Sequence, residues 1–348
     1  MQQPPQPLGY QQTNFQQTNT QLQAPPAPLG YGQTPQQFPI VPQTGYVQNP
    51  AFGVPLTMMP QQNQYQNQQI KTNMDYEESV RRFNELAQRN EICKDFVDRL
   101  RNLDGIEIVI IADDSGSMDS SIPPRPEKAS SSRYTRWMEL QDFINTSVDI
   151  VSTVDSDGCD VYFLNREPVL NVTKKEQLYA TFSRSPSGCT PITSTYERVL
   201  NAKRQVIKEK GLLIIIATDG EPTDIHGNVN IAEFKRALSV TKKQFEVQNS
   251  NAKGKAGKVF TTILACTDDE DTMSYLNGWD KEIERLDVVD DYASEKKEVL
   301  SAQGSKYRFT YGEYIVKTIM GSFDKWFDNL DERKNTVNSE NSGCCTLM

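Results

Sequence analysis

Three runs of apolar residues predict strands that are buried on both faces. They are Ile106–Ala112, Leu212–Ala217 and Val259–Cys266. Such runs, with little alternation of polar residues, are typical of parallel strands that helices cover on both sides. Shorter strands are expected at Asp160–Leu164 and near Val169–Val172.

The segments between these strands carry apolar residues at three- and four-residue steps, which is the spacing of amphipathic helices. One helix is expected to bury Trp137, Leu140, Ile144, Val148 and Val151. Others are expected at Thr190–Ile207, Asn230–Val247, Ser294–Ala302 and Glu313–Leu330, with only short helices in Asp268–Asp291. Strands that alternate with helices predict an α/β fold with a doubly wound, mostly parallel, Rossmann-like sheet.

Composition divides the chain into four parts. Residues 1–75 are rich in Gln and Pro, and no charged side chain precedes Lys71. Such a segment cannot bury enough apolar surface to fold alone, so we expect a disordered arm. A helical lead-in at 76–103, an α/β domain at 104–331 and a flexible tail at 332–348 follow.

The arm contains a near-repeat, Pro4-Pro5-Gln6-Pro7-Leu8-Gly9-Tyr10 and Pro25-Pro26-Ala27-Pro28-Leu29-Gly30-Tyr31. Proline-rich segments of this kind serve as docking sites or support self-association, and they also occur as solvated tails. The repeat itself names no partner.

The charge balance is acidic, with 46 Asp and Glu against 37 Lys and Arg. This balance argues against nucleic-acid binding, which needs a concentrated basic face. No apolar run has a membrane-spanning length, and the first residues lack the pattern of a signal peptide. Gln2 stands where N-myristoylation requires glycine. We therefore expect a cytoplasmic protein with reduced cysteines.

Oxygen-bearing side chains follow two of the predicted strands. Asp113, Ser115 and Ser117 come directly after the first apolar run, and Asp219 follows the second. Thr190 opens a helix after a Pro-Ser-Gly-Cys loop. The carboxyl ends of neighbouring parallel strands share one crevice, so these five side chains can converge. Carboxylates and hydroxyls suit a hard cation, and we expect Mg²⁺, with Mn²⁺ or Ca²⁺ as alternatives.

This pattern resembles the von Willebrand factor type A (vWA) domain with its metal-ion-dependent adhesion site. The family's Asp-x-Ser-x-Ser matches Asp113-Asp114-Ser115-Gly116-Ser117, and its later Thr and Asp match Thr190 and Asp219. The resemblance covers residues 104–330 and includes intracellular relatives such as the copines. It implies a metal ion that links the domain to a carboxylate on a partner protein.

Two features depart from the family pattern. Cys189 replaces the second glycine before the threonine, and the insert 118–134 lengthens the step into the first helix. We expect the insert to border the site and influence partner choice. Asp114 is expected to cap a helix or to be a solvated charge.

Two other functions remain as alternatives. A metal-dependent hydrolase would need a second carboxylate where Ser115 stands, or a triad built on His226, the only histidine. No nucleotide-phosphate loop or nucleophile elbow is present in the sequence. We therefore predict that the protein is not an enzyme. A metal-free structural scaffold, in which the same side chains only cap helices, is the second alternative.

The sequence ends in Cys345-Thr346-Leu347-Met348, which has the form of a farnesylation box. One lipid binds membranes weakly, and the tail has no basic cluster as a second signal. Cys344 is therefore a candidate for palmitoylation. These two lipids would attach the protein to the cytosolic face of a membrane.

Overall fold

A computed structural model describes residues 78, 80–125, 128–129, 133–246, 254–267 and 269–331. The predicted arm at 1–75 and the whole predicted tail at 332–348 lie outside the described residues, and so do both candidate lipidation sites, Cys344 and Cys345.

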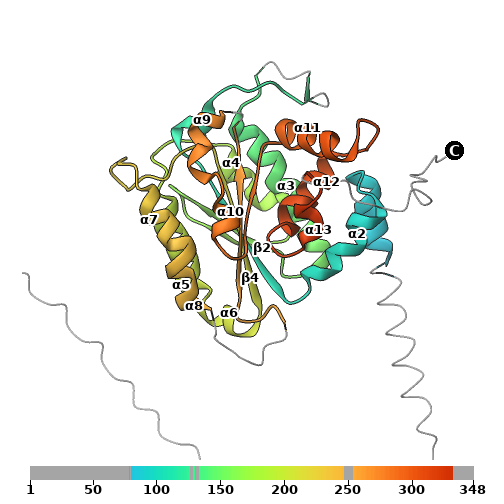
Figure 1. The fold of residues 1–348 in the computed structure, drawn as a ribbon, viewed down its shortest axis with the longest axis horizontal. Coiled ribbons are helices and arrows are strands. Elements are labelled where there is room, and N and C mark those ends of the chain that lie inside the picture. The colour runs from blue at the N-terminus through green and yellow to red at the C-terminus, as the bar shows by residue number, and fades with distance from the viewer. Residues whose placement is uncertain are drawn as a thin grey trace, which may run out of the picture. The chain divides into compact units, whose positions relative to one another are not determined.

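The described residues form a sheet of six strands in the order β3-β2-β1-β4-β5-β6 (Figure 1). The strands are β1 (Ile106–Ala112), β2 (Cys159–Phe163), β3 (Val169–Val172), β4 (Gly211–Thr218), β5 (Val259–Ala265) and β6 (Leu286–Val289). All neighbours pair in parallel except β3, which runs antiparallel to β2 at one edge. This arrangement confirms the predicted α/β class with a mostly parallel sheet.

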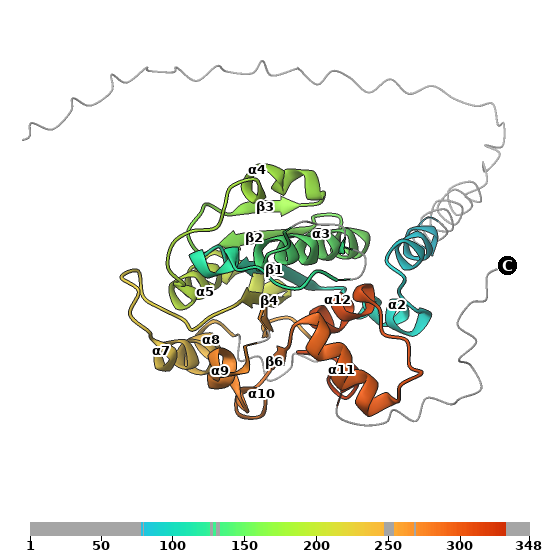
Figure 2. The same ribbon diagram turned by 90° about the horizontal axis from the view of Figure 1, so that it is seen from above.

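Helices cover both faces of the sheet, which Figure 2 shows edge-on. One face carries α2 (Lys94–Leu100), α3 (Arg136–Val154), α11 (Tyr292–Gln303), α12 (Tyr311–Met320) and α13 (Lys325–Asp328). The other carries α5 (Ile192–Ala202), α6 (Arg204–Glu209), α7 (Ile231–Arg236) and α8 (Lys242–Phe245). Shorter helices are α4 (Tyr179–Phe182), α9 (Glu270–Met273) and α10 (Trp279–Glu282). No helix among the described residues has both the length and the apolar character to span a bilayer.

Strand β1 shows why the apolar runs lack polar alternation. Ile108 and Ile110 pack into the core under α3 and α12, whereas Val109 and Ile111 pack into the core under α5. Both faces of the strand are therefore shielded from water, and each fully buried aliphatic side chain contributes about 1.5–3 kcal/mol.

Helix α3 follows the prediction closely. Thr135 precedes it, and the Thr135 hydroxyl accepts a hydrogen bond from the Met138 N–H at 3.3 Å. The predicted buried positions, Trp137, Leu140, Ile144, Val148 and Val151, are all buried. Before β1 the described residues form a helix over residues 80–89 and helix α2.

The predicted long helices are interrupted. The helix expected at Glu313–Leu330 ends at Met320, because Asp324 begins a new helix by accepting from the Trp326 N–H at 3.1 Å. Asn230–Val247 contains a π-helical turn at Ala237–Thr241. The helix after Thr190 breaks between α5 and α6 at Lys203.

The prediction for Asp268–Asp291 missed strand β6. This strand has four residues and directly follows Arg285, whose φ of 56° is in the left-handed region. A strand this short gives little periodicity to detect.

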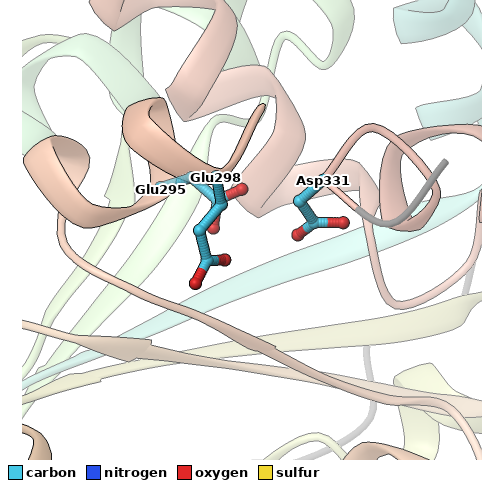
Figure 3. Close-up of side chains that lie close together, drawn as sticks. All are labelled: Glu295, Glu298 and Asp331. Atoms are coloured by element: carbon cyan, nitrogen blue, oxygen red, sulfur yellow. The ribbon is translucent and has the colours of Figure 1, made fainter. Parts of the chain in front are cut away.

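A buried ion-pair cluster joins α11, α12 and Asp331, which follows α13. Lys317 Nζ lies 2.9 Å from Glu295 and 3.1 Å from Asp331, and both Lys317 and Glu295 side chains are 2% exposed. Glu295, Glu298 and Asp331 each offer a carboxylate oxygen within 4.8 Å of the others (Figure 3). The pKa of Glu295 is raised to about 7, mainly by burial, although Lys317 opposes the shift. The Lys317 ammonium supplies the positive charge beside Glu295 and Asp331.

Replacing Lys317 by Met should therefore lower the free energy of unfolding by about 3–5 kcal/mol, because it leaves Glu295 buried and unpaired. The loss should be smaller at pH 6 than at pH 8, since the raised pKa favours neutral Glu295 as pH falls. Urea unfolding at both pH values measures this effect. Lys297→Met, at an exposed position of α11, is the matched control and should change stability little. Equal stability of the two variants would contradict the assigned role of Lys317.

Candidate metal site at the carboxyl ends of β1 and β4

The pairing of β1 with β4 places two aspartates next to each other. The strands run parallel with Ala112 opposite Ala217, and the Asp113 N–H donates to the Ala217 carbonyl at 2.9 Å. The Thr218 hydroxyl donates to Asp113 Oδ2 at 2.6 Å. Asp113 and Asp219 therefore leave neighbouring strands at the same level of the sheet.

The loop after β1 turns back towards Asp219. Asp113 Oδ1 accepts from the Ser115 N–H at 2.8 Å, which closes a tight turn before the 3₁₀ turn Gly116–Asp119. Ser115 Oγ and Ser117 Oγ lie 3.0 Å apart, and Ser117 Oγ donates to Asp219 Oδ1 at 2.7 Å. Four of the five predicted residues are thus joined in one continuous chain of hydrogen bonds.

Thr190 is held close to this group by its backbone. The Gly116 N–H donates to the Gly188 carbonyl at 3.2 Å, which ties the two loops together. The Thr190 N–H donates to Thr223 Oγ1 at 3.0 Å. Within the described part of the chain, no hydrogen bond joins the Thr190 side chain to the other four residues. The structure therefore brings its loop to the site without showing its hydroxyl in the cluster.

Gly188 fixes the conformation of this loop, although Cys189 stands where the vWA pattern has a second glycine. The φ of Gly188 is 114°, and a Cβ atom there would collide with the Asn165 side chain. Asn165 Nδ2 also donates to the Cys189 carbonyl at 2.8 Å. The unusual cysteine is accommodated because the single glycine supplies the required backbone conformation.

The two aspartates lie in a low-dielectric environment. Asp113 and Asp219 are 0% and 2% exposed, and Ser115 is 2% exposed, whereas Ser117 is exposed. Burial raises the pKa of Asp113 to about 6, and the negative charge of Asp219 adds to the shift. Two adjacent buried carboxylates disfavour each other's charge unless a cation is present.

The spacing of the oxygens fits a small hard cation. Mg²⁺ binds oxygen at about 2.1 Å in octahedral geometry, so adjacent ligand oxygens lie about 3.0 Å apart. The oxygen separations of 3.0 Å between Ser115 and Ser117, and 2.7 Å between Ser117 and Asp219, are close to that value. Hydroxyl and carboxylate oxygens are also the chemical type that Mg²⁺ and Mn²⁺ accept. The residues present therefore fit a divalent cation.

Sequence reasoning did not find the residues that support the site. Asp114 is neither a cap nor a solvated charge: it is fully buried, and Arg166 Nε lies 3.0 Å from its Oδ2. Arg166 also donates to the Thr181 carbonyl in α4 and to the Ser185 carbonyl in the loop after it. No local pattern connects residues this far apart in the chain.

Arg136 was also missed, and it contacts a predicted ligand directly. Its Nη1 donates to Asp219 Oδ2 at 2.8 Å, and its Nη2 donates to Thr267 Oγ1 at 2.6 Å. The sequence contained one signal for Arg136: a basic residue at the first position of a helix is unfavourable, because it lies at the positive end of the helix dipole. Such a residue often has an acidic partner elsewhere in the fold.

The insert 118–134 closes at its base beside the site. The Arg136 N–H donates to the Ser120 carbonyl at 3.1 Å, and Ser121 pairs with Thr135 in an antiparallel bridge. Arg125, further along the insert, packs over the Tyr311 ring at 3.5 Å. The ends of the insert thus lie at the site, whereas Arg125 extends towards α12.

No known family model matches the chain, and no characterised protein matches its sequence. Among solved structures, a mutant of the PilB minor pilin from Streptococcus sanguinis is similar, with 12% identity and a TM-score of 0.38. The match covers 65% of this chain and 62% of the pilin, so this chain spans less than two thirds of the pilin's length. The manganese-loaded TRAP protein of Plasmodium vivax has 13% identity and a TM-score of 0.33, over 55% of this chain and 70% of that one. These likenesses are distant and assign the chain to no family.

Asp113→Asn should stabilise the metal-free protein at pH 7.5. A folded-state pKa above the unfolded value means that the stability contribution of Asp113 declines as pH rises from about 4 through about 6. The neutral amide avoids this loss, which is on the order of 3 kcal/mol. Thermal unfolding in chelator should therefore favour the variant at pH 7.5, with a smaller difference at pH 5.

Adding Mg²⁺ should reverse the order at pH 7.5, because only the wild type retains both carboxylates. Asp119→Asn removes an exposed acid from the same loop and serves as the control. A variant that is less stable than the wild type in chelator at pH 7.5 would contradict this account of Asp113.

Proposed function

We propose that this protein is a non-catalytic interaction module of the vWA type. It would bind a divalent cation, preferably Mg²⁺, and through that cation a carboxylate on a partner protein. The observation that carries this proposal is the close convergence of the Ser115, Ser117 and Asp219 oxygens beside Asp113. Ser115, Ser117 and Asp219 would hold the ion with Asp113 and Thr190, and the ion would supply an electrophilic centre for the partner's oxygen.

The uneven burial of the site supports this role. Asp113 and Asp219 are buried, whereas Gly116 and Ser117 are exposed. A cation held by these oxygens would be accessible from the Ser117 side. Two carboxylates and the hydroxyls do not complete an octahedral shell, so water or an oxygen of the partner would fill it.

An apolar surface beside the site would give the partner a second contact. Ile225 and Val229 are 73% and 56% exposed on the loop that follows Asp219. Thr223 of this loop pairs with Val229 and donates through its N–H to the Thr190 carbonyl at 2.9 Å. We propose that the partner's acidic residue is accompanied by an apolar side chain. Exposed apolar residues near a polar site are typical of protein interfaces.

A hydrolase is the second candidate, and the hydrogen bonding at Asp113 argues against it. Both oxygens of Asp113 accept hydrogen bonds, from the Ser115 N–H and the Thr218 hydroxyl. A nucleophilic carboxylate would need a free oxygen and a nearby acid or base. Ser115 occupies the position where such an acid would be expected, and His226 is an exposed loop residue.

A double variant, Ser115→Ala with Ser117→Ala, tests the metal site. It should weaken Mn²⁺ binding at least about tenfold, because even changes outside the ligand shell cost 10–100-fold in metal affinity. Titration followed by Mn²⁺ electron paramagnetic resonance measures the affinity. Ser120→Ala is the matched control, since Ser120 contributes a backbone carbonyl but no described side-chain contact.

The same Mn²⁺ signal can report on acidic ligands. A short poly-glutamate peptide should displace bound water from the ion, whereas a poly-glutamine peptide should not.

Unchanged Mn²⁺ affinity in the double variant would favour the metal-free scaffold. Hydrolysis of p-nitrophenyl phosphate that requires Asp113 would favour the hydrolase.

We further propose that lipids on Cys345 and Cys344 attach the protein to the cytosolic face of a membrane. The support is the sequence Cys345-Thr346-Leu347-Met348, which has the form of a farnesylation box. Cys345→Ser should remove a farnesyl mass and shift the protein to the soluble fraction. Cys344→Ser should keep the farnesyl group and show weaker membrane binding, because a single lipid binds marginally. A wild type without added lipid mass would refute the tether.

A further inference from the structure

The Arg136 guanidinium already occupies a position where it neutralises a candidate metal ligand. Arg136 is the first residue of α3, and its Nη1 lies 2.8 Å from Asp219 Oδ2. The Arg136 side chain is 17% exposed and that of Asp219 is 0% exposed. An ion pair this close and this shielded from water has a strong electrostatic interaction.

Asp219 faces two different partners through its two oxygens. Oδ1 accepts from Ser117, on the side of the proposed ion, and Oδ2 accepts from Arg136. Thr267, just after β5, holds the second nitrogen of the guanidinium at 2.6 Å. Arg136 therefore connects the end of β4 to the end of β5 while it supplies a positive charge to the site.

The charges at the site explain how a positive charge such as that of Arg136 stabilises it. Asp113 and Asp219 bring two negative charges into a nearly dry environment, where isolated charges are costly. A divalent ion would neutralise both, and Arg136 neutralises one of them without any ion. With both present, like charges would lie close together, and each would weaken the binding of the other.

We infer that Arg136 is an internal cation that competes electrostatically with the divalent metal for Asp219. It keeps the metal-free site folded, and it lowers the affinity for metal. This inference rests on the proposed function, because it assumes that Asp219 helps to bind an ion. In the opposite role, Arg136 only orients Asp219 for the metal. The two roles predict changes of opposite sign when Arg136 is removed.

Arg136→Gln separates these roles. Without the positive charge, Mn²⁺ should bind about tenfold more tightly or better, as judged from the Coulomb energy of such charges at protein-like dielectric. In chelator, the same variant should unfold at a lower temperature than the wild type, because buried Asp219 loses its counter-ion while buried Asp113 lies beside it. The rise in unfolding temperature on adding Mg²⁺ should consequently be larger than in the wild type.

Arg133→Gln is the matched control. Arg133 lies three residues before Arg136, and it pairs with exposed Asp119 at 2.9 Å rather than with Asp219. Its removal makes the same change in net charge and should leave Mn²⁺ affinity and unfolding temperature unchanged. Arg136→Lys keeps the charge and should retain the affinity of the wild type, which separates charge from the shape of the side chain.

Weaker Mn²⁺ binding by Arg136→Gln would overturn the competition and assign Arg136 an orienting role. Unchanged binding, or equal tightening in Arg133→Gln, would also overturn it. If the wild type binds Mn²⁺ and only the competition fails, the proposed function stands. If neither the wild type nor any variant binds Mn²⁺, the proposed function and the competition both fail.

Discussion

The register between β1 and β4 is the constraint on which the candidate site depends. Parallel pairing with Ala112 opposite Ala217 brings Asp113 and Asp219 to the same edge, although they are distant in sequence. A shift of one residue would turn every side chain of one strand to the opposite face. The two separate cores prevent such a shift, because each strand buries alternate residues in a different core. The packing of the sheet therefore fixes the spacing of the two carboxylates.

Buried polar contacts then position the loops that the strands leave undetermined. One oxygen of Asp114 accepts from the backbone N–H of Asn165, and Arg166 pairs with the other oxygen. Arg166 extends this network to the loop that carries Gly188 and Thr190. Backbone hydrogen bonds between the loops complete the connection. A buried, ion-paired network of this kind makes the loop arrangement well defined, because breaking any member leaves a buried charge unpaired.

The sequence predicted those features that depend on local pattern. Apolar runs predicted β1, β4 and β5, because a strand that is buried on both faces is apolar along its whole length. Apolar residues at helical spacing predicted α3, because that helix buries one face. Asp113 and Asp219 were predicted because strand ends meet at one edge. Strand β6 and the break after Met320 depend on tertiary contacts: the Asp287 carboxylate lies where a side chain at Gly321 would project. Arg136 was missed for the same reason, since its partner Asp219 follows β4 and is distant in sequence.

The charges of the site also bear on the choice of ligand. Asp113, Asp219 and Arg136 together carry one net negative charge if both acids are ionised. A divalent ion changes this to one net positive charge in a largely buried site, which is unfavourable until an anion neutralises it. Under the proposed function, a carboxylate from a partner would restore neutrality, so ion and acidic ligand would each favour the binding of the other. Thermodynamic linkage requires this coupling to be equal in both directions. A moderate affinity for the ion alone would then make partner binding, rather than ion concentration, the event that loads the site.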